Sequence, residues 1–179
     1  MPDELGAPVT TTSGPDGQPA LMLVPLWNGD KLHGQRAVGQ LQALGKPQLA
    51  QIGPMTYTDM LGPIDTQLAE LAGCPWETRT RSLRALMPAA IDAIIRAVAR
   101  RTSPHSMVYW HYFHGAATRI PAEAIAFGLR REHFMVEIIA AWEADAYDGA
   151  AQAGRGDAGC ITADQITTSA GLLPFDLIY

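Results

Sequence analysis

The chain has 179 residues, and its content of 47% hydrophobic and 17% charged residues excludes a chain that is disordered throughout. Thirteen Lys and Arg against 18 Asp and Glu give a net charge of −5, which argues against a surface that binds nucleic acid or an anionic membrane. Only two cysteines are present, so a disulfide framework and a zinc ribbon are excluded. A secretory signal pattern and a long apolar run are both missing, so we expect a soluble, cytoplasmic protein of mixed secondary structure.

Five segments make up the N-terminal half. Residues 1–20 contain the turn-forming run Gly-Pro-Asp-Gly and are expected to form a flexible arm. Residues 21–27, LMLVPLW, are a short apolar run between turns, which predicts a buried strand. Residues 31–44 predict a helix that Asp30 is placed to cap. Residues 48–54 are expected to return as a strand, and residues 55–71 to form two short helical turns broken at Gly62-Pro63.

The C-terminal half has stronger patterns. Residues 76–83 alternate bulky and polar side chains, which is typical of a half-exposed strand. Residues 88–101 predict the clearest helix, and its apolar stripe is expected to consist of Ile91, Ile94, Ile95 and Val98. Residues 106–115 and 133–142 are rich in aromatic or β-branched side chains and predict two further strands.

This order predicts an α+β or α/β layer, with one sheet of about four or five strands and helices on one face. We expect residues 21–145 to form that domain. Residues 146–179 are small, polar and weakly patterned, so we expect a linker-like tail with an apolar end over 172–179.

The aromatic strand expected over 106–115 carries the first candidate site. In an extended chain Tyr109, His111 and Phe113 share one face, and the residues between them share the other. Two interpretations stay open: both faces are core, or one face is an aromatic platform for a planar ligand. His111 and His114 lie on opposite faces and cannot share a metal ion, so we expect no metal site.

Glu137 is the second candidate, because it stands alone in the apolar stretch 134–142. Burying a carboxylate costs several kcal/mol unless it is paired or protonated. Glu137 is therefore paired with an arginine such as Arg130 or Arg131, exposed on a solvated face, or placed in a cavity suited to base chemistry. Extended geometry puts His133 on the same side of the strand.

Several motifs follow one another in a familiar order: PLWNGD (25–30), QIGPMTYTDM (51–60), CPWETRTRSLRAL (74–86), YFHGAATRIPAEAIAFGLRREHF (112–134) and then Trp142. Together they resemble the substrate domain of berberine-bridge-enzyme-like FAD-linked oxidases. The resemblance covers about residues 20–145 and implies an antiparallel sheet backed by helices, with an open face over the flavin ring. In plant members of that family an active-site Glu or Gln lies five positions before the matching tryptophan, which is Glu137 in this chain.

The family's flavin-binding domain has no counterpart in this sequence, so we expect the chain to bind no FAD unless another chain supplies a flavin domain. The first interpretation is a lone or truncated substrate-binding domain for a small organic molecule. The alternatives are a cofactor-free acid/base enzyme that reuses the pocket and a non-catalytic dimeric binding module. The residues assigned are Glu137 and His111 as catalytic groups and Tyr109, Phe113 and His133 as substrate-binding groups. An apolar sheet face would also favour a homo-oligomer.

Overall fold

The computed structural model describes residues 1–14 and 16–143. Its main sheet has five antiparallel strands in the order β3-β2-β6-β7-β5, namely β3 (Pro19–Leu23), β2 (Val9–Ser13), β6 (Met107–Phe113), β7 (His133–Ala141) and β5 (Trp76–Leu83). A second, two-stranded sheet joins β1 (Leu5–Gly6) to β4 (Leu26–Trp27). The helices are α1 (Lys31–Gln42), α2 (Tyr57–Glu70) and α3 (Pro88–Ala99), with a short 3₁₀ turn η1 (Gly115–Arg119). The predicted α+β fold with an antiparallel sheet is confirmed.

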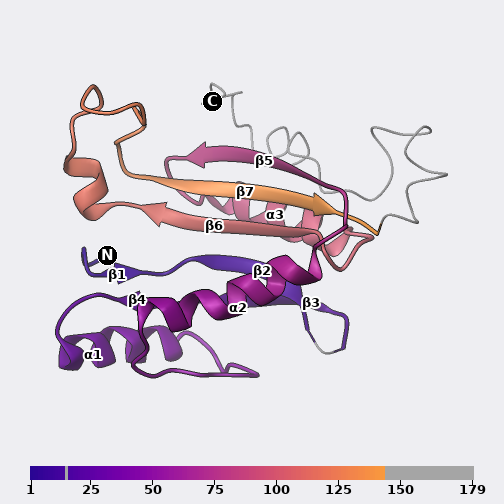
Figure 1. Cartoon of the computed structure of the whole chain (residues 1–179), viewed down its shortest axis with the longest axis horizontal. Helices are drawn as coiled ribbons and strands as arrows, with labels where there is room; N and C mark the ends of the chain where they lie inside the picture. The colour runs from indigo at the N-terminus through magenta and orange to yellow at the C-terminus, as the bar shows by residue number, and fades with distance from the viewer. Residues whose placement is uncertain (15, 144–179) are drawn as a thin grey trace.

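Helix α3 packs across one face of the sheet, which we call the closed face (Figure 1). Val108 of β6 and Val136 of β7 are fully buried beneath it, and each such side chain contributes about 1.5–3 kcal/mol of burial free energy. The helix turns three of its five alanines and two larger side chains to the sheet: Ala90, Ala93, Ile94, Ala97 and Val98. The small alanines let the helix axis approach the strands closely.

The predicted stripe of α3 is wrong in two positions. Ile94 and Val98 are buried, but Ile91 and Ile95 are 43% and 60% exposed. The reason for the difference is that three alanines, which the expected stripe did not include, face the sheet. They occupy the turn-by-turn positions nearest the sheet and rotate Ile91 and Ile95 outward.

The expected flexible arm over residues 1–20 is also wrong, because residues 9–13 form strand β2 inside the sheet between β3 and β6. The Thr11 hydroxyl accepts a hydrogen bond from the Val108 N–H at 2.8 Å, and it lies 3.3 Å from the Val108 carbonyl oxygen, to which it donates. The run VTTTS has the β-branched residues that favour a strand. The domain therefore includes the segment that the sequence analysis placed outside it.

The first six residues are held by the motif HGAATR (114–119). The His114 Nε2–H donates to the Leu5 carbonyl at 3.1 Å, and Arg119 forms an ion pair with Asp3 at 2.5 Å. Gly115 has a φ of +66°, and a Cβ there would lie 3.1 Å from the Asp3 carboxylate. One motif after β6 thus fixes the N-terminal segment against the end of the sheet.

Three smaller expectations also differ from the structure. The single buried strand expected over 21–27 is instead divided between the end of β3, which is an exposed edge strand, and β4. Residues 48–54 form no strand. Residues 57–70 form one continuous helix through Gly62 and Pro63. The helix begins with a reciprocal cap between Thr56 and Asp59. The Asp59 N–H donates to Thr56 Oγ1, and the Thr56 hydroxyl donates to Asp59 Oδ2. The tail expected over 146–179 lies outside the described residues.

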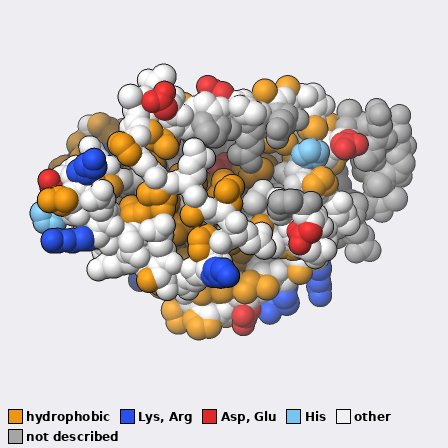
Figure 2. All heavy atoms as spheres, turned by 90° about the horizontal axis from the view of Figure 1, so that it is seen from below, with side chains coloured by type: hydrophobic (Ala, Val, Ile, Leu, Met, Phe, Trp, Pro, Cys, Tyr) orange, Lys and Arg blue, Asp and Glu red, His pale blue; other side chains and the backbone are white. Residues whose placement is uncertain are grey.

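Large hydrophobic side chains are exposed along β3 and along the connection from α1 to α2. Leu21, Leu44, Leu49 and Tyr57 each expose two thirds or more of their surface. Figure 2 shows the molecule from below Figure 1, the side on which α1 lies, and hydrophobic side chains gather in the middle of that view. Single exposed hydrophobic residues are ordinary, but a gathering of them indicates a surface that another structure covers.

Gly34 gives a direct test of the packing between α1 and β4. A Cβ on Gly34 would lie 2.6 Å from Trp27 Cδ1, whereas a Cβ on Gly39 of the same helix meets nothing within 4 Å. We expect Gly34→Ala to lower the free energy of unfolding by about 1–3 kcal/mol because the ring must move. The control Gly39→Ala should raise it by about 0.5–1 kcal/mol. Urea denaturation of both variants measures the free energy of unfolding. An equal increase of that free energy in both variants would refute the contact between Gly34 and Trp27.

Candidate functional site

The second face of the sheet, which we call the open face, carries every residue that the sequence analysis assigned to a site. The register places Tyr109 opposite Glu137, His111 opposite Met135, and Phe113 opposite His133. Directly opposed residues in an antiparallel pair point to the same face. These side chains are half-buried, except for His133, which is only 2% exposed. The closed face holds the alternate residues of both strands, among them Val108 and Val136.

Glu137 lies in the middle of this face, flanked by Tyr109 of β6 and Thr80 of β5. No hydrogen bond or ion pair joins its carboxylate to another of the described residues. The guanidinium of Arg130 instead donates to the carbonyls of Phe127 at 3.0 Å and Ala117 at 3.3 Å. The interpretation in which Arg130 pairs with Glu137 is therefore wrong, and the carboxylate is left on a half-buried face.

The two groups beside Glu137 are held in their neutral forms at neutral pH. Burial raises the pKa of Tyr109, and the negative charge of Glu137 raises it further. Burial lowers the pKa of His111, and the nearby His133 lowers it further. The rings of Tyr109 and His111 meet edge to face with centroids 5.6 Å apart. This part of the face therefore combines one carboxylate with a neutral phenol and a neutral imidazole.

An aromatic cluster closes one end of the open face. The ring of Phe113 stacks on His133 at 4.9 Å and meets Phe127 at 5.5 Å. Arg130 lies over the Phe127 ring at 5.0 Å, and this contact fixes the loop before β7. The Nδ1–H of His133 donates to the Arg131 carbonyl at 2.7 Å. Phe127 and Arg130 belong to this cluster, although the sequence pattern gave no sign that Phe127 approaches the face.

The opposite row of aromatic residues is structural. Trp110 packs against the core under α3, and Tyr112 stacks on Phe134 at 4.8 Å. The Tyr112 hydroxyl donates to Glu132 at 2.7 Å. The described residues contain no cluster of three or more His, Cys, Asp or Glu side chains that could hold a metal ion.

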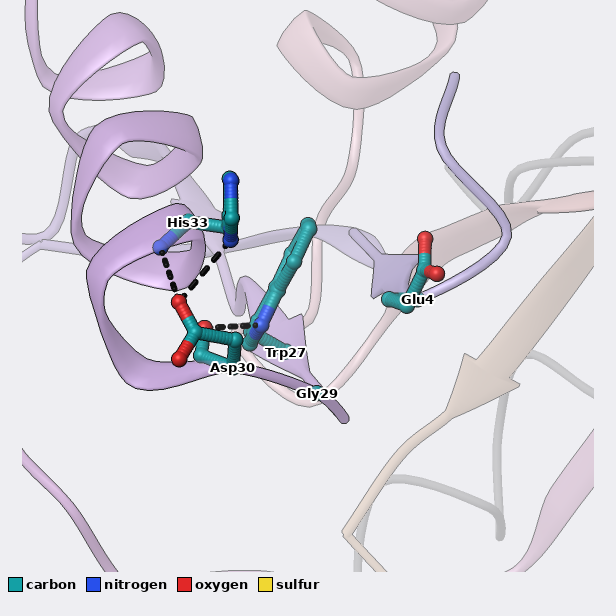
Figure 3. A pocket seen from close by; sticks show the side chains of 5 residues that line it. All are labelled: Glu4, Trp27, Gly29, Asp30 and His33. Carbon is teal, nitrogen blue, oxygen red and sulfur yellow. Dashed lines mark hydrogen bonds and ion pairs between the residues drawn. The ribbon is translucent and has the colours of Figure 1, made fainter.

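A shallow pocket of about 330 Å³ lies elsewhere, where β1 and β4 meet the start of α1 (Figure 3). Glu4, Trp27, Gly29, Asp30 and His33 line it. Its polar groups already serve the fold: the Asp30 carboxylate accepts from the N–H groups of Leu32 and His33 at 3.0 Å, and Trp27 Nε1–H donates to the Asp30 carbonyl at 2.9 Å. The backbone hydrogen bond from His33 is the main reason that the pKa of Asp30 is lowered. The motif PLWNGD thus builds the entry to α1.

The starts of α1, α2 and α3 offer no place for the phosphate groups of FAD. Phosphate groups bind where the N–H groups at a helix start are free. In α1 those groups are bonded to Asp30, and in α2 the start carries the Thr56–Asp59 cap, so both starts already hold a carboxylate. Helix α3 begins with a proline at its first turn, and the N–H groups of Ala90 and Ile91 donate to the Met87 carbonyl. No site for the phosphates is formed by these helices.

No protein-family model matches this chain, and no curated protein sequence matches it. Within residues 1–14 and 16–143, no helix has the length and apolar character that crossing a membrane requires.

Solved structures give the clear likeness. BBE-like 28 from Arabidopsis thaliana is 14% identical with a TM-score of 0.65, and the match covers 85% of this chain and 34% of that one. Berberine bridge enzyme from Eschscholzia californica is 15% identical with a TM-score of 0.61, over 83% and 32%. A variant of Physcomitrella patens BBE-like 1 is 15% identical with a TM-score of 0.62, over 94% and 36%. The chain spans about a third of the length of these structures and has the fold of that third, which confirms the resemblance drawn from the motifs.

Proposed function

We propose that the open face binds a small, planar organic molecule and that the chain acts as a substrate-binding domain. The observation that carries this proposal is the place of Glu137, a carboxylate without an ionic partner among the described residues, between Tyr109 and Thr80 on a half-buried face that also carries the rings of His111 and Phe113. Small-molecule sites combine mostly apolar and aromatic walls with a few polar groups that orient the ligand. In this proposal Tyr109 and Phe113 supply the walls, and Glu137 orients a polar group of the ligand.

The solved relatives supply a chemical context for this proposal. One berberine bridge enzyme structure is a complex with (S)-reticuline, and one variant of that enzyme is described as a reticuline dehydrogenase. A flavin accepts a hydride from an organic substrate. Since the starts of α1, α2 and α3 form no site for the phosphates of FAD, we expect that oxidation of a molecule on the open face needs a flavin held by another segment or another chain. The groups of this chain would then bind and orient the substrate, and Glu137 would accept a proton from it.

A second candidate function is acid/base catalysis without a cofactor, and the state of His111 favours it. A neutral imidazole beside a carboxylate and a phenol gives the face both a proton acceptor and a proton donor. The two functions differ in one observable. The acid/base enzyme converts its substrate in the purified chain, whereas the binding domain only binds it until a flavin-containing partner is added.

Ligand binding by the open face is tested with a matched pair of tyrosines on one strand. Tyr109 lies on the open face and Tyr112 on the closed face. We expect hits from a screen of planar phenols and amines, with (S)-reticuline included, and we expect Tyr109→Ala to weaken their binding by about tenfold or more. Tyr112→Ala should leave binding unchanged, although it also removes a stacked ring. Calorimetry measures both. No binding to the wild type, or equal loss in both variants, would refute the proposal.

Replacing Glu137 separates a binding role from a structural one. Because the carboxylate has no ionic partner among the described residues, Glu137→Gln should change the free energy of unfolding by less than about 0.5 kcal/mol. A carboxylate that held a buried arginine would instead cost about 3–5 kcal/mol on removal. Urea denaturation gives this number, and calorimetry with a screened ligand should show weaker binding by the same variant.

The lowered pKa of His111 predicts a dependence of stability on pH. In the unfolded chain its imidazole takes up a proton as the pH falls through about 6.5, whereas the folded chain resists that proton until a lower pH. Protonation therefore favours the unfolded state, and stability should fall as the pH drops below about 6.5. In the His111→Gln variant the stability should fall less steeply below about pH 6.5 than in the wild type. Above that pH the two proteins should show the same dependence of stability on pH. An NMR titration in which His111 protonates at or above its ordinary pKa would contradict the assignment.

A further inference from the structure

The two edges of the five-stranded sheet differ in how they are protected. Strand β5 forms one edge and carries Glu77, Arg79 and Arg81, the charges that normally keep an edge from pairing with another chain. Strand β3 forms the other edge with the sequence PALML, which has no charge at all. Its Leu21, Met22 and Leu23 are 67%, 42% and 37% exposed.

The free backbone N–H groups of β3 belong to two residues. The Gly14 N–H donates to the Gln18 carbonyl, and the Val24 N–H donates to the Pro8 carbonyl. Bonded residues alternate along an antiparallel strand, so Ala20 and Met22 bond inward to β2. The N–H and C=O groups of Leu21 and Leu23 therefore point outward, away from the sheet, and no other strand in the described part of the chain takes them up.

We infer that β3 pairs with β3 of a second copy of this chain, in an antiparallel arrangement about a twofold axis. Placing Met22 opposite Met22 of the partner brings Leu21 opposite the partner's Leu23 and satisfies both outward residues of each copy. The same pairing sets apolar side chains against apolar side chains across the axis. A second copy is the occupant because this uncharged edge complements itself, whereas the charged β5 edge does not complement it.

The pairing is tested on the full chain by sedimentation across the micromolar range. We expect a dimer of twice the 19.2 kDa chain mass. Leu21→Pro removes an outward N–H but no bond to β2, and Leu21→Lys adds a charge to the edge. Each should raise the dissociation constant by about tenfold or more. Leu32→Lys is the matched control, since Leu32 on α1 is 65% exposed, and it should leave the dimer unchanged.

The register has its own test. In a background with Cys74→Ser and Cys160→Ser, the variant Met22→Cys should form an intermolecular disulfide under mild oxidation, because the two Cβ atoms face each other across the axis. Circular dichroism checks that each variant keeps its fold. If Leu21→Pro fails to fold, Leu21→Lys and the disulfide still decide the question. A monomeric wild type, or a dimer that both Leu21 variants leave intact, would overturn the inference.

Discussion

The packing of α3 on strands β6 and β7 is the constraint on which the rest of the structure depends. Three alanines bring the helix close enough to bury Val108 and Val136 completely. Because side chains alternate along a strand, this contact also decides which residues leave the core. Tyr109, His111 and Glu137 take the opposite face as a direct consequence of where the valines lie. The candidate site is thus the outer side of the same two strands that form the core.

Local patterns predicted the central strands and α3 well, since alternation and β-branched content act within a few residues. The alternation of side chains along a strand also predicted that Tyr109, His111 and Phe113 of β6 share one face, as the structure shows. Strand β2 was missed because the Gly-Pro-Asp-Gly run after it suggested an arm. What makes β2 a strand is its contact with Val108, almost a hundred positions away. Contacts of that range leave no local pattern.

The motif HGAATR shows how a recognisable sequence can serve structure and not chemistry. His114, Gly115 and Arg119 hold the first six residues against the end of the sheet. The motif PLWNGD does the same for the start of α1 through Trp27 and Asp30. Titratable groups in both motifs are already used in these contacts. The groups of the open face differ, because Glu137 and His111 have no hydrogen-bond partner among the described residues, and chemistry is better placed there.

The open face and the β3 edge are linked by one row of side chains. Glu137, Tyr109, Thr10 and Met22 lie opposite one another on four neighbouring strands. In the proposed dimer this row continues through Met22 of the second copy, so the two open faces join into one surface. With about 4.8 Å between strands, the two Glu137 residues would lie seven strand spacings, or roughly 34 Å, apart. Two separate small molecules fit that distance, and a ligand on one face leaves the pairing edge free.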